Sequence, residues 1–569
     1  MNILLTTLHS KYSHASLALP YLAAVCGDLP DVSCSVKEFT INEPRDLTLR
    51  LIMAEQADLV AFSCYIWNIE KTLRIISDIK KVDPGIRIVL GGPETSFNAF
   101  ELMHENQAID FIIKGEGEAA FRQLVETLLA SDPDVFPGVA LEEIPNLYFR
   151  DHDRNEIAVG PHTSRSIPLD SIPSPFRASL VDMGKPLLYY ETSRGCPFSC
   201  AFCLSSVEGQ VRSYSMERIH ADLEFLMERG VPQIKLVDRT FNFDIQRAMD
   251  IWQFILEHNR CSHFHFEIAA DLLTDAAIDM LRSVPEKMFR FEIGVQSASR
   301  KTLESINRRS DLGRLFYMIR RLRAETNIEL HLDLIAGLPQ ERLPDFLGSL
   351  QSVADLKPHM IQVEPLKVLK GSPMREVARR HDYQFSSTPP YTILKNPWLS
   401  YPDICRIETI GRLLDLFHND GGFAAALRCL GRFRSFSELF DLMAREVSVE
   451  SLTGRSQRRL YEFFARLAEP FVPGDSRAEL LDALFFDYCC CEMPTMGKLP
   501  LFAGNQERCA WPGKAELPAG VSFPEGSRVR QFRYRFDRDY RCETWSEGPT
   551  EVTFVYGSGP GQGLSVVVV

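Results

Sequence analysis

The sequence predicts an α/β protein in three parts: a doubly wound parallel sheet, a partial (β/α)6 barrel and a mainly helical C-terminal domain. Short apolar runs alternate with helical stretches in two sets, at a spacing of about 25 residues that is typical of βα units. A polar stretch with seven prolines, between residues 133 and 175, separates the two sets. We therefore expect domains at 1–140, 186–400 and 401–569, with a linker at 141–185.

Length, charge and cysteine content limit the class of protein. A chain of 569 residues exceeds one ordinary core, so we expect roughly two to four domains. The formal net charge of −13 argues against nucleic acid as the main partner. Residues 1–5 lack a basic segment, and the apolar run 564–569 is far shorter than the roughly 20 residues that span a bilayer. We expect a cytoplasmic protein with no membrane partner, and fourteen cysteines fit a reducing compartment.

The first set of apolar runs predicts a ligand site at one edge of a sheet. The runs lie at 2–8, 32–40, 59–65, 87–93 and 111–118. Three of them end in small or turn-forming residues: Ser63-Cys64, Gly91-Gly92-Pro93 and Gly115-Glu116-Gly117. Ordinary turn chemistry explains any single one of these endings. Three in register, all at the carboxyl ends of strands, favour a ligand site.

The second set of runs predicts six strands of a partial barrel, whose chemistry belongs at the carboxyl ends of the strands. The runs lie at 187–194, 233–241, 264–270, 289–296, 328–337 and 360–366, with helical segments between them. Polar residues on or beside these strands are Glu267, His331, Asp333, Glu364 and Lys367. A register shift of one residue reverses every side chain of a strand, so the pattern leaves open which of them face the cavity.

Beyond residue 400 the apolar spacing is that of helices. Ile404, Ile407 and Ile410 begin one apolar face, and the glycine pair at 421–422 ends it. The run Cys489-Cys490-Cys491 ends another predicted helix. Adjacent cysteines do not readily bind one ion with good geometry, so we interpret this run as packing.

The cysteine motif of the second set predicts an iron–sulfur cluster. Cys196, Cys200 and Cys203 follow a predicted strand at a CxxxCxxC spacing. Three thiolates at this spacing can hold one [4Fe–4S] cluster and leave its fourth iron open. The alternatives are a zinc site, which would want a fourth ligand nearby, or simple packing. The next cysteines, Cys64 and Cys261, are far along the chain, so the cluster is the favoured interpretation.

This motif, with an aromatic residue before the last cysteine, resembles the signature of the radical S-adenosylmethionine superfamily. Segments 237–242, 291–297 and 333–339 are similar to the strand motifs of that superfamily that surround the cofactor. The resemblance implies that S-adenosylmethionine binds the open iron and is cleaved by one electron to methionine and a 5′-deoxyadenosyl radical. It also implies an electron donor such as flavodoxin or ferredoxin. The cofactor contacts it implies are Phe202, Asp238, Thr240, Glu292, Gln296, Ser297 and Asp333.

The first 125 residues resemble the cobalamin-binding, flavodoxin-like domain that precedes the barrel in a subset of this superfamily. The matching segments are 59–63, 89–93 and 111–118. The DxHxxG motif is absent, so no histidine ligand to cobalt is assigned, and the resemblance implies cobalamin with its dimethylbenzimidazole detached. It places Tyr65, Trp67, Gly91, Gly92, Pro93 and Glu116 around the cofactor.

Each of these placements has a simpler alternative. Tyr65 and Trp67 also suit core packing of the following helix, and Cys64 suits a small buried apolar residue at a strand end. His9 and His14 are interpreted as loop histidines with ordinary partners rather than as cobalt ligands.

Three functions follow from the resemblance. The first is cobalamin-dependent methyl transfer to an unactivated carbon or to phosphorus in a small-molecule or peptide substrate. The alternative is a radical enzyme that binds cobalamin but catalyses a rearrangement, cyclisation or oxidation without methyl transfer. The third is a catalytically silent cobalamin-sensing protein, which the intact cysteine triad argues against.

Overall fold

The computed structural model describes residues 1–569 except 133–136, 152, 164–166, 208–209, 449–451, 453, 496–497, 506–520, 522, 525–526, 543–547 and 559–563. The chain folds into two compact units. The first comprises 1–294, 300–330 and 366–397, and the second comprises 295–299, 331–365 and 398–569. Among the described residues, no helix has both the length and the apolar content needed to span a membrane.

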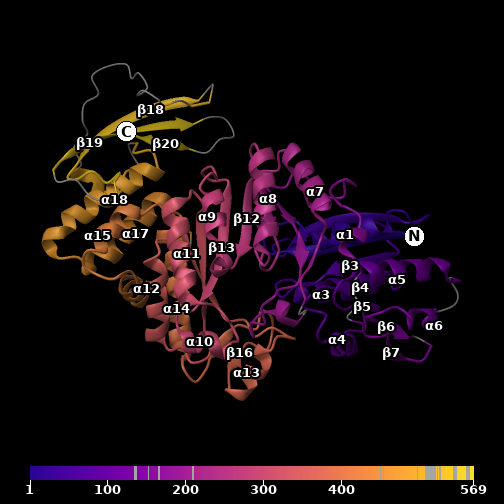
Figure 1. Cartoon of the computed structure of the whole chain (residues 1–569). Helices are drawn as coiled ribbons and strands as arrows, with labels where there is room; N and C mark the ends of the chain where they lie inside the picture. Colours follow the sequence, from indigo (N-terminus) through magenta and orange to yellow (C-terminus); the bar gives the residue numbers. More distant parts are fainter. Residues whose placement is uncertain are drawn as a thin grey trace. The chain divides into compact units, whose positions relative to one another are not determined.

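The N-terminal sheet is doubly wound, as predicted. Its five parallel strands have the order β2-β1-β3-β4-β5, which is the flavodoxin-like order, and helices connect them (Figure 1). The strands are β1 (Asn2–His9), β2 (Ser33–Thr40), β3 (Leu59–Ser63), β4 (Arg87–Gly91) and β5 (Phe111–Ile113). The helices are α1 (Ala18–Cys26), α2 (Arg45–Met53), α3 (Ile69–Val82), α4 (Ala99–Glu105) and α5 (Glu118–Ala130).

This sheet extends beyond the expected boundary at residue 140. Helix α6 (Gly138–Leu141) is followed by β6 (Leu147–Asp151) and β7 (Glu156–Val159), which join the edge of β5 in antiparallel pairing. The prolines of this stretch lie outside both strands, where they do not interrupt the pairing. Part of the predicted linker is therefore part of the sheet.

The first unit also contains four parallel strands of the barrel region. They pair in the order β8-β11-β12-β13, and are β8 (Leu187–Tyr190), β11 (Gln233–Leu236), β12 (His263–Ile268) and β13 (Phe289–Gln296), the last of which ends in the second unit. The helices between and after them are α7 (Met216–Glu228), α8 (Ile245–His258), α9 (Asp275–Leu281), α10 (Arg300–Ser305) and α11 (Leu312–Glu325). A short antiparallel pair, β9 (Ser193–Arg194) and β10 (Arg212–Ser213), follows β8.

One face of these strands is apolar and is covered by helices. Trp252 of α8 is fully buried and stacks on Phe291 of β13, with ring centroids 5.3 Å apart. Phe266 of β12 contacts both rings. Because side chains alternate along a strand, the polar residues of the same strands point to the opposite face.

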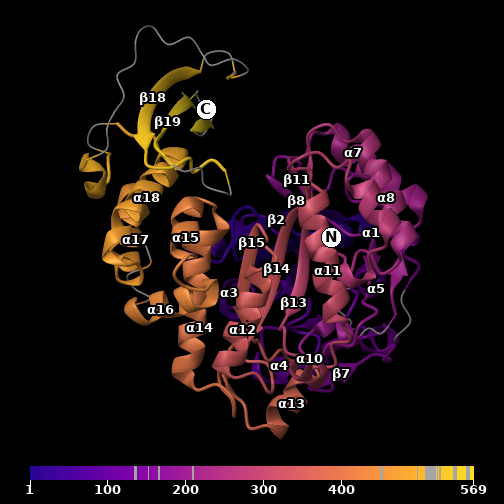
Figure 2. The same ribbon diagram turned by 60° about the vertical axis from the view of Figure 1, so that its left-hand side comes forward.

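The second unit holds the last two barrel strands and the C-terminal helices. Strand β14 (Glu329–Ala336), which begins in the first unit, pairs in parallel with β15 (Met360–Pro365), and α12 (Leu343–Ala354) lies between them in the chain. All six predicted barrel strands are thus present. Helix α14 (Tyr401–Leu414) packs on β15 (Figure 2), and a Cβ atom added at Gly411 would lie 3.3 Å from the Val363 carbonyl oxygen, which is a tight contact.

The C-terminal region is mainly helical, as predicted, and ends in a small sheet. Its other helices are α15 (Ala424–Leu430), α16 (Phe436–Glu446), α17 (Gln457–Ala468) and α18 (Arg477–Cys491). The strands β18 (Arg528–Phe536), β19 (Thr550–Ser558) and β20 (Ser565–Val568) form an antiparallel sheet. Cys489 is fully buried at the end of α18, which agrees with packing.

We expect Asp487 of α18 to make the stability of this region depend on pH. Its buried carboxylate accepts hydrogen bonds from the amides of Ala425 (3.0 Å) and Ala426 (2.8 Å), and burial raises its pKa to about 7. The unfolded chain ionises this group near pH 4, so its stabilising contribution is complete in acid and is lost as the pH rises to about 7. The neutral variant Asp487→Asn should flatten the fall in melting temperature between about pH 4 and 7. An unchanged slope, with the exposed Asp475→Asn as control, would contradict this expectation.

Candidate functional site

A loop at the carboxyl end of β8 carries the three motif cysteines. Gly195 begins it with a φ of +94°, and a side chain there would come within 2.3 Å of the Gln210 carbonyl oxygen. Cys200 is buried, whereas Cys196 and Cys203 are partly exposed. The backbone amide of Cys203 donates to the carbonyl of Cys200 over 3.1 Å, which holds the loop in a turn.

Residues from other strands and loops contact two of these thiols. The Cys196 sulfur lies 3.5 Å from the hydroxyl of Thr240, which follows β11. Arg308 donates from Nη1 to the Cys200 sulfur over 3.6 Å and from Nη2 to the Gly294 carbonyl over 2.7 Å. Burial raises the pKa of the Cys200 thiol, and the Arg308 guanidinium opposes that rise because it favours the thiolate.

The spacing of the three sulfurs fits a cluster better than one ion. They do not form a group whose ligand atoms all lie within 4.8 Å of one another, which is the reach of ligands on a single metal ion. Thiolates of a [4Fe–4S] cluster bind separate irons and stand further apart. The residues present therefore suit the cluster that the sequence predicted.

Asp238 and Thr240, which the resemblance places at the cofactor, lie directly behind the cysteine loop. The Asp238 carboxylate is completely buried and accepts hydrogen bonds from the backbone amide of Thr192 (3.0 Å) and the hydroxyl of Ser193. The Asp238 carboxylate therefore holds the end of β8 in place, and both of its oxygens accept hydrogen bonds from that segment. Phe202 is half-buried within the loop itself.

The side of the barrel strands away from the helices forms a polar face. It comprises Tyr189, Lys235, His265, Glu267 and Glu292, which share one side by strand register. Lys235 Nζ lies 2.9 Å from Glu292 and 3.5 Å from Glu267, and His265 Nε2 lies 2.7 Å from Glu292. The structure thus resolves the orientation that the sequence left open for Glu267.

These charges stabilise one another despite their burial. Burial acts to lower the pKa of Lys235, but Glu292 and Glu267 raise it above its usual value overall. Burial acts to raise the pKa of Glu292, but His265 and Lys235 hold it well below its usual range. Glu292 is therefore an anion at neutral pH and orients the lysine of the polar face.

In the second unit, the segment after β13 is tightly held. Gln296 adopts a left-handed conformation with a φ of +68°, and the buried Ser297 donates to Glu341 over 2.5 Å. His331 Nε2 lies 3.1 Å from an Asp333 carboxylate oxygen on β14. Ser297 is thus engaged by its own unit, whereas Asp333 is partly exposed.

Two aromatic rings lie at the carboxyl edge of the N-terminal sheet. Tyr65 and Trp67 stack with centroids 4.4 Å apart and planes within 4° of parallel. Trp67 donates from its indole nitrogen to the Leu8 carbonyl over 3.2 Å and remains 42% exposed. The buried Asn68 donates to the carbonyls of Leu8 and Ser63, which joins the ends of β1 and β3. Trp67 therefore lies at the surface of this edge, and Tyr65, stacked on it, is partly buried.

The same edge approaches the polar face. His14 contacts Tyr189 with ring centroids 6.1 Å apart, and burial together with His9 and Lys235 lowers the pKa of His14. His9 pairs with Glu38 over 3.2 Å, which agrees with an ordinary loop histidine. Within the first unit, the edge of the N-terminal sheet and the polar face are therefore in contact at His14 and Tyr189.

Packing within the protein accounts for one of the two glycines at the end of β4. Gly92 has a φ of +102°, and a side chain there would come within 2.6 Å of the Cys64 carbonyl oxygen. Gly91 would bring a side chain to 3.8 Å from the Ile113 carbonyl, which is ordinary contact. Pro93 is exposed beside them. Close packing of the loops after β3 and β4 therefore explains Gly92 without a ligand.

Glu116 belongs to an ion-pair network that sequence reasoning missed. Arg194, only 14% exposed, lies 2.6 Å from Glu118, 2.7 Å from Glu191 and 3.4 Å from Glu116, and Arg212 also pairs with Glu116. Arg194 stands two residues before the first motif cysteine. The network joins the loop after β5 to the start of the cysteine loop.

No local signal marks the two arginines that contact this site. Arg308 is 108 residues from Cys200, and Arg194 is 76 residues from Glu118. The spacing of residues over a short stretch of sequence predicts helices, turns and ligand motifs. It does not predict contacts between residues that are so far apart along the chain.

Family models match three segments of the chain. A B12 binding domain matches residues 3–125, the radical SAM superfamily matches 190–353, and a protein family of unknown function, DUF4080, matches 379–511. The first match covers the parallel strands β1 to β5 of the N-terminal sheet, and the second begins at the last residue of β8 and covers the barrel strands β11 to β14.

Curated relatives are similar over the same part of the chain. The cobalamin-dependent radical SAM methyltransferase TokK of Streptomyces tokunonensis is 25% identical over 60% of this chain and 51% of that protein. The hopanoid C-3 methylase of Methylococcus capsulatus is 28% identical over 52% of this chain and 56% of that one. The chain thus spans about half the length of these relatives.

Two solved structures share the fold. The cobalamin-dependent S-adenosylmethionine radical enzyme OxsB, with aqua-cobalamin and S-adenosylmethionine bound, has a TM-score of 0.58 at 16% identity and covers 86% of this chain and 78% of its own. The radical S-adenosylmethionine methyltransferase TsrM of Kitasatospora setae has a TM-score of 0.55 at 17% identity and covers 68% and 80%.

We expect the variant Cys200→Ala to lose the iron–sulfur cluster, because two thiolates cannot hold three irons of one cubane. Iron and sulfide analysis after anaerobic reconstitution measures this, with the exposed Cys261→Ala as the matched control. A full complement of iron in Cys200→Ala would remove the assignment of the motif.

Proposed function

We propose that this chain, a cobalamin-binding radical S-adenosylmethionine enzyme, methylates an unactivated carbon or a phosphorus centre of a small-molecule or peptide substrate. One observation carries the proposal: a single compact unit holds the cysteine loop, the polar face and the edge of a cobalamin-type sheet, and His14 of that edge contacts Tyr189 of the polar face. Both cofactors of such a reaction can therefore reach one substrate.

The cofactors supply the reactive species and the protein arranges them. The [4Fe–4S] cluster with S-adenosylmethionine supplies a 5′-deoxyadenosyl radical, and cobalamin supplies the methyl group. Cys196, Cys200 and Cys203 would hold the cluster, and Arg308 fixes the loop by bonding both the Cys200 sulfur and the β13 backbone. Tyr65 and Trp67 would support the corrin, whose flat ring matches their stacked and exposed surface.

The polar face would bind and orient the substrate. Lys235 is fixed between Glu292 and Glu267, so its ammonium group presents a defined donor rather than a mobile charge. The apolar, helix-covered side of the same strands excludes water behind this layer.

We further propose a cytoplasmic enzyme that receives its electron from a donor such as flavodoxin or ferredoxin. The acidic net charge of −13 and the fourteen cysteines support a reducing compartment and argue against a nucleic-acid substrate.

Methyl transfer requires two molecules of S-adenosylmethionine in each turnover, one as methyl donor and one as radical source. We therefore expect S-adenosylhomocysteine and 5′-deoxyadenosine in about equal amounts when substrate is present, as measured by liquid chromatography. The Cys203→Ala variant is the control and should release no 5′-deoxyadenosine. Substrate-stimulated 5′-deoxyadenosine without S-adenosylhomocysteine would favour the alternative, a cobalamin-dependent rearrangement, cyclisation or oxidation.

The cobalt should have no protein imidazole ligand. His9 is paired with Glu38, His14 contacts Tyr189, and the DxHxxG motif is absent. Electron paramagnetic resonance of the cobalt(II) form of the full chain should show no nitrogen superhyperfine splitting. Splitting that disappears in His14→Gln would contradict the unligated arrangement, and failure to bind cobalamin would contradict the domain assignment.

A further inference from the structure

The turn that follows α10 packs against the cysteine loop. The backbone carbonyl of Ile306 accepts a hydrogen bond from the amide of Ala201 over 2.8 Å. The side-chain amide of Asn307, which has a φ of +53°, donates to the carbonyl of Ser199 over 3.1 Å. These two residues come directly before Arg308 in the chain and hold the middle of the loop.

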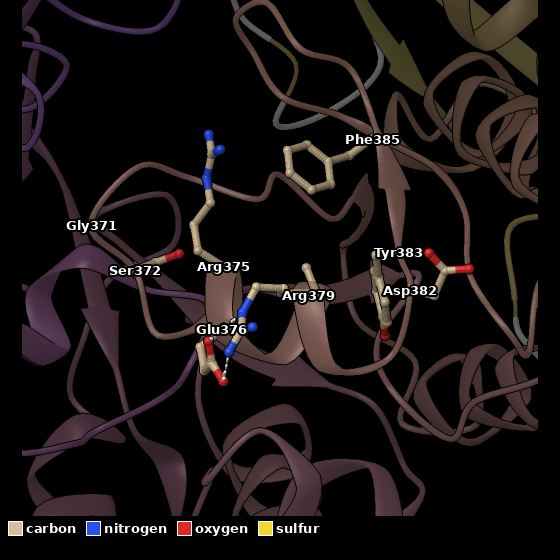
Figure 3. Close-up of a pocket in the computed structure, with 9 residues that line it drawn as sticks. Gly371, Ser372, Arg375, Glu376, Arg379, Asp382, Tyr383 and Phe385 are labelled. Carbon is tan, nitrogen blue, oxygen red and sulfur yellow. Dashed lines mark hydrogen bonds and ion pairs between the residues drawn. The ribbon is translucent and has the colours of Figure 1, made fainter. Parts of the chain in front are cut away.

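Helix α13 (Met374–Arg380) holds the same loop from another element. The backbone amide of Met374 donates to the Ala201 carbonyl over 2.8 Å, so both backbone polar groups of Ala201 are bound. Figure 3 shows charged side chains of this helix, where Glu376 binds Arg379 over 2.9 and 3.0 Å. The cysteine loop is therefore held by several contacts that do not involve Arg308.

Arg308 adds a fixed positive charge beside one of the three sulfurs. Its Nη1 donates to the Cys200 sulfur over 3.6 Å, and its Nη2 donates to the Gly294 carbonyl over 2.7 Å. The guanidinium carbon lies 5.8 Å from the ring centroid of Phe198, which is within the range of a cation–π contact. Within the part of the chain that the structure describes, no carboxylate forms an ion pair with Arg308. A neutral carbonyl and an aromatic ring therefore orient the guanidinium without cancelling its charge.

This charge acts on the most buried sulfur of the motif. Cys200 is 5% exposed, whereas Cys196 and Cys203 are partly exposed. Hydrogen bonds to the sulfurs, net charge and solvent exposure set the reduction potential of an iron–sulfur cluster. One-electron reduction adds a negative charge to the cluster and its thiolates, and a guanidinium shielded from water offsets that charge more strongly than an exposed one. The position of Arg308 therefore favours the reduced form.

We propose that Arg308 is a positioning residue that raises the reduction potential of the [4Fe–4S] cluster through the Cys200 sulfur. One electron passes from a low-potential donor protein, of the flavodoxin or ferredoxin class, to the cluster, and no bond forms or breaks in this step. Arg308 makes that transfer more favourable before S-adenosylmethionine is cleaved. The inference rests on the assignment of the three cysteines to the cluster and does not depend on methyl transfer.

A redox titration of the full chain after anaerobic reconstitution tests the role of Arg308, with electron paramagnetic resonance of the reduced cluster as the measurement. The neutral variant Arg308→Gln should lower the midpoint potential by about 59 mV or more, which is a tenfold change in the ratio of reduced to oxidised cluster for one electron. Arg308→Lys should lower it less, because lysine keeps the charge but cannot bond Cys200 and Gly294 with one planar group.

Two matched controls separate the charge of Arg308 from the fold of the loop. Asn307→Gly removes the contact with Ser199 and keeps the left-handed backbone, which glycine adopts readily. Arg309→Gln removes the exposed positive charge of the next residue, which water and salt screen. Both controls should keep the wild-type potential, and iron and sulfide analysis should show a full cluster in every variant.

Three outcomes would overturn the role of Arg308. They are a wild-type potential in Arg308→Gln, an equal shift in Arg308→Gln and in either control, and an incomplete cluster in Arg308→Gln, which would show a purely structural role. A wild-type chain that binds no iron would contradict the cysteine assignment and the inference with it. A lowered potential in Arg308→Gln, in a wild-type enzyme that transfers no methyl group, would support the role of Arg308 and contradict the proposed function alone.

Discussion

The ion pairs of Arg194 are the constraint on which the arrangement of the site depends. Arg194 binds Glu118 at the start of α5 and Glu191 between β8 and the cysteine loop, and it stands two residues before Cys196. With 14% of its side chain exposed, the arginine needs both carboxylates, since removing one partner of a buried pair costs about 3–5 kcal/mol. The network therefore sets the N-terminal sheet against the loop that would hold the cluster.

The rest of the site follows from this placement. The stacked Tyr65 and Trp67 lie at the carboxyl edge of the N-terminal sheet, and His14 of the same edge contacts Tyr189 of the polar face. Lys235 and Glu292 lie on the same polar face as Tyr189. A radical reaction that uses two cofactors requires them to share one substrate, and the contact between His14 and Tyr189 brings the edge of the N-terminal sheet to the polar face.

The sequence predicted what depends on local spacing. The spacing of apolar runs and helical stretches predicted the two parallel sheets, because strand alternation and helix period depend on residues that are close along the chain. The interval between Cys196 and Cys203 indicated the cluster for the same reason. The N-terminal sheet extends beyond the predicted domain boundary at residue 140 because it includes β6 and β7. These two short antiparallel strands lie between prolines in the sequence, so the apolar pattern did not indicate them.

Residues with distant partners escaped prediction. Glu116, which the resemblance places at the cofactor, also pairs with Arg212, 96 residues away. A side chain at Gly92, which the resemblance places there too, would collide with the Cys64 carbonyl oxygen. The Asp238 carboxylate also ties the end of β8. In each case tertiary contacts occupy the side chain or the space, and spacing along the chain does not report them.

Methyl transfer itself is tested most directly by isotopic labelling. The enzyme would be incubated anaerobically with cell extract and S-adenosylmethionine that carries a deuterated methyl group, and the metabolites would be compared by mass spectrometry. The account predicts one metabolite that gains the intact labelled methyl group, together with 5′-deoxyadenosine, and no such gain with Cys203→Ala. A metabolite consumed with release of 5′-deoxyadenosine but without the label would contradict it.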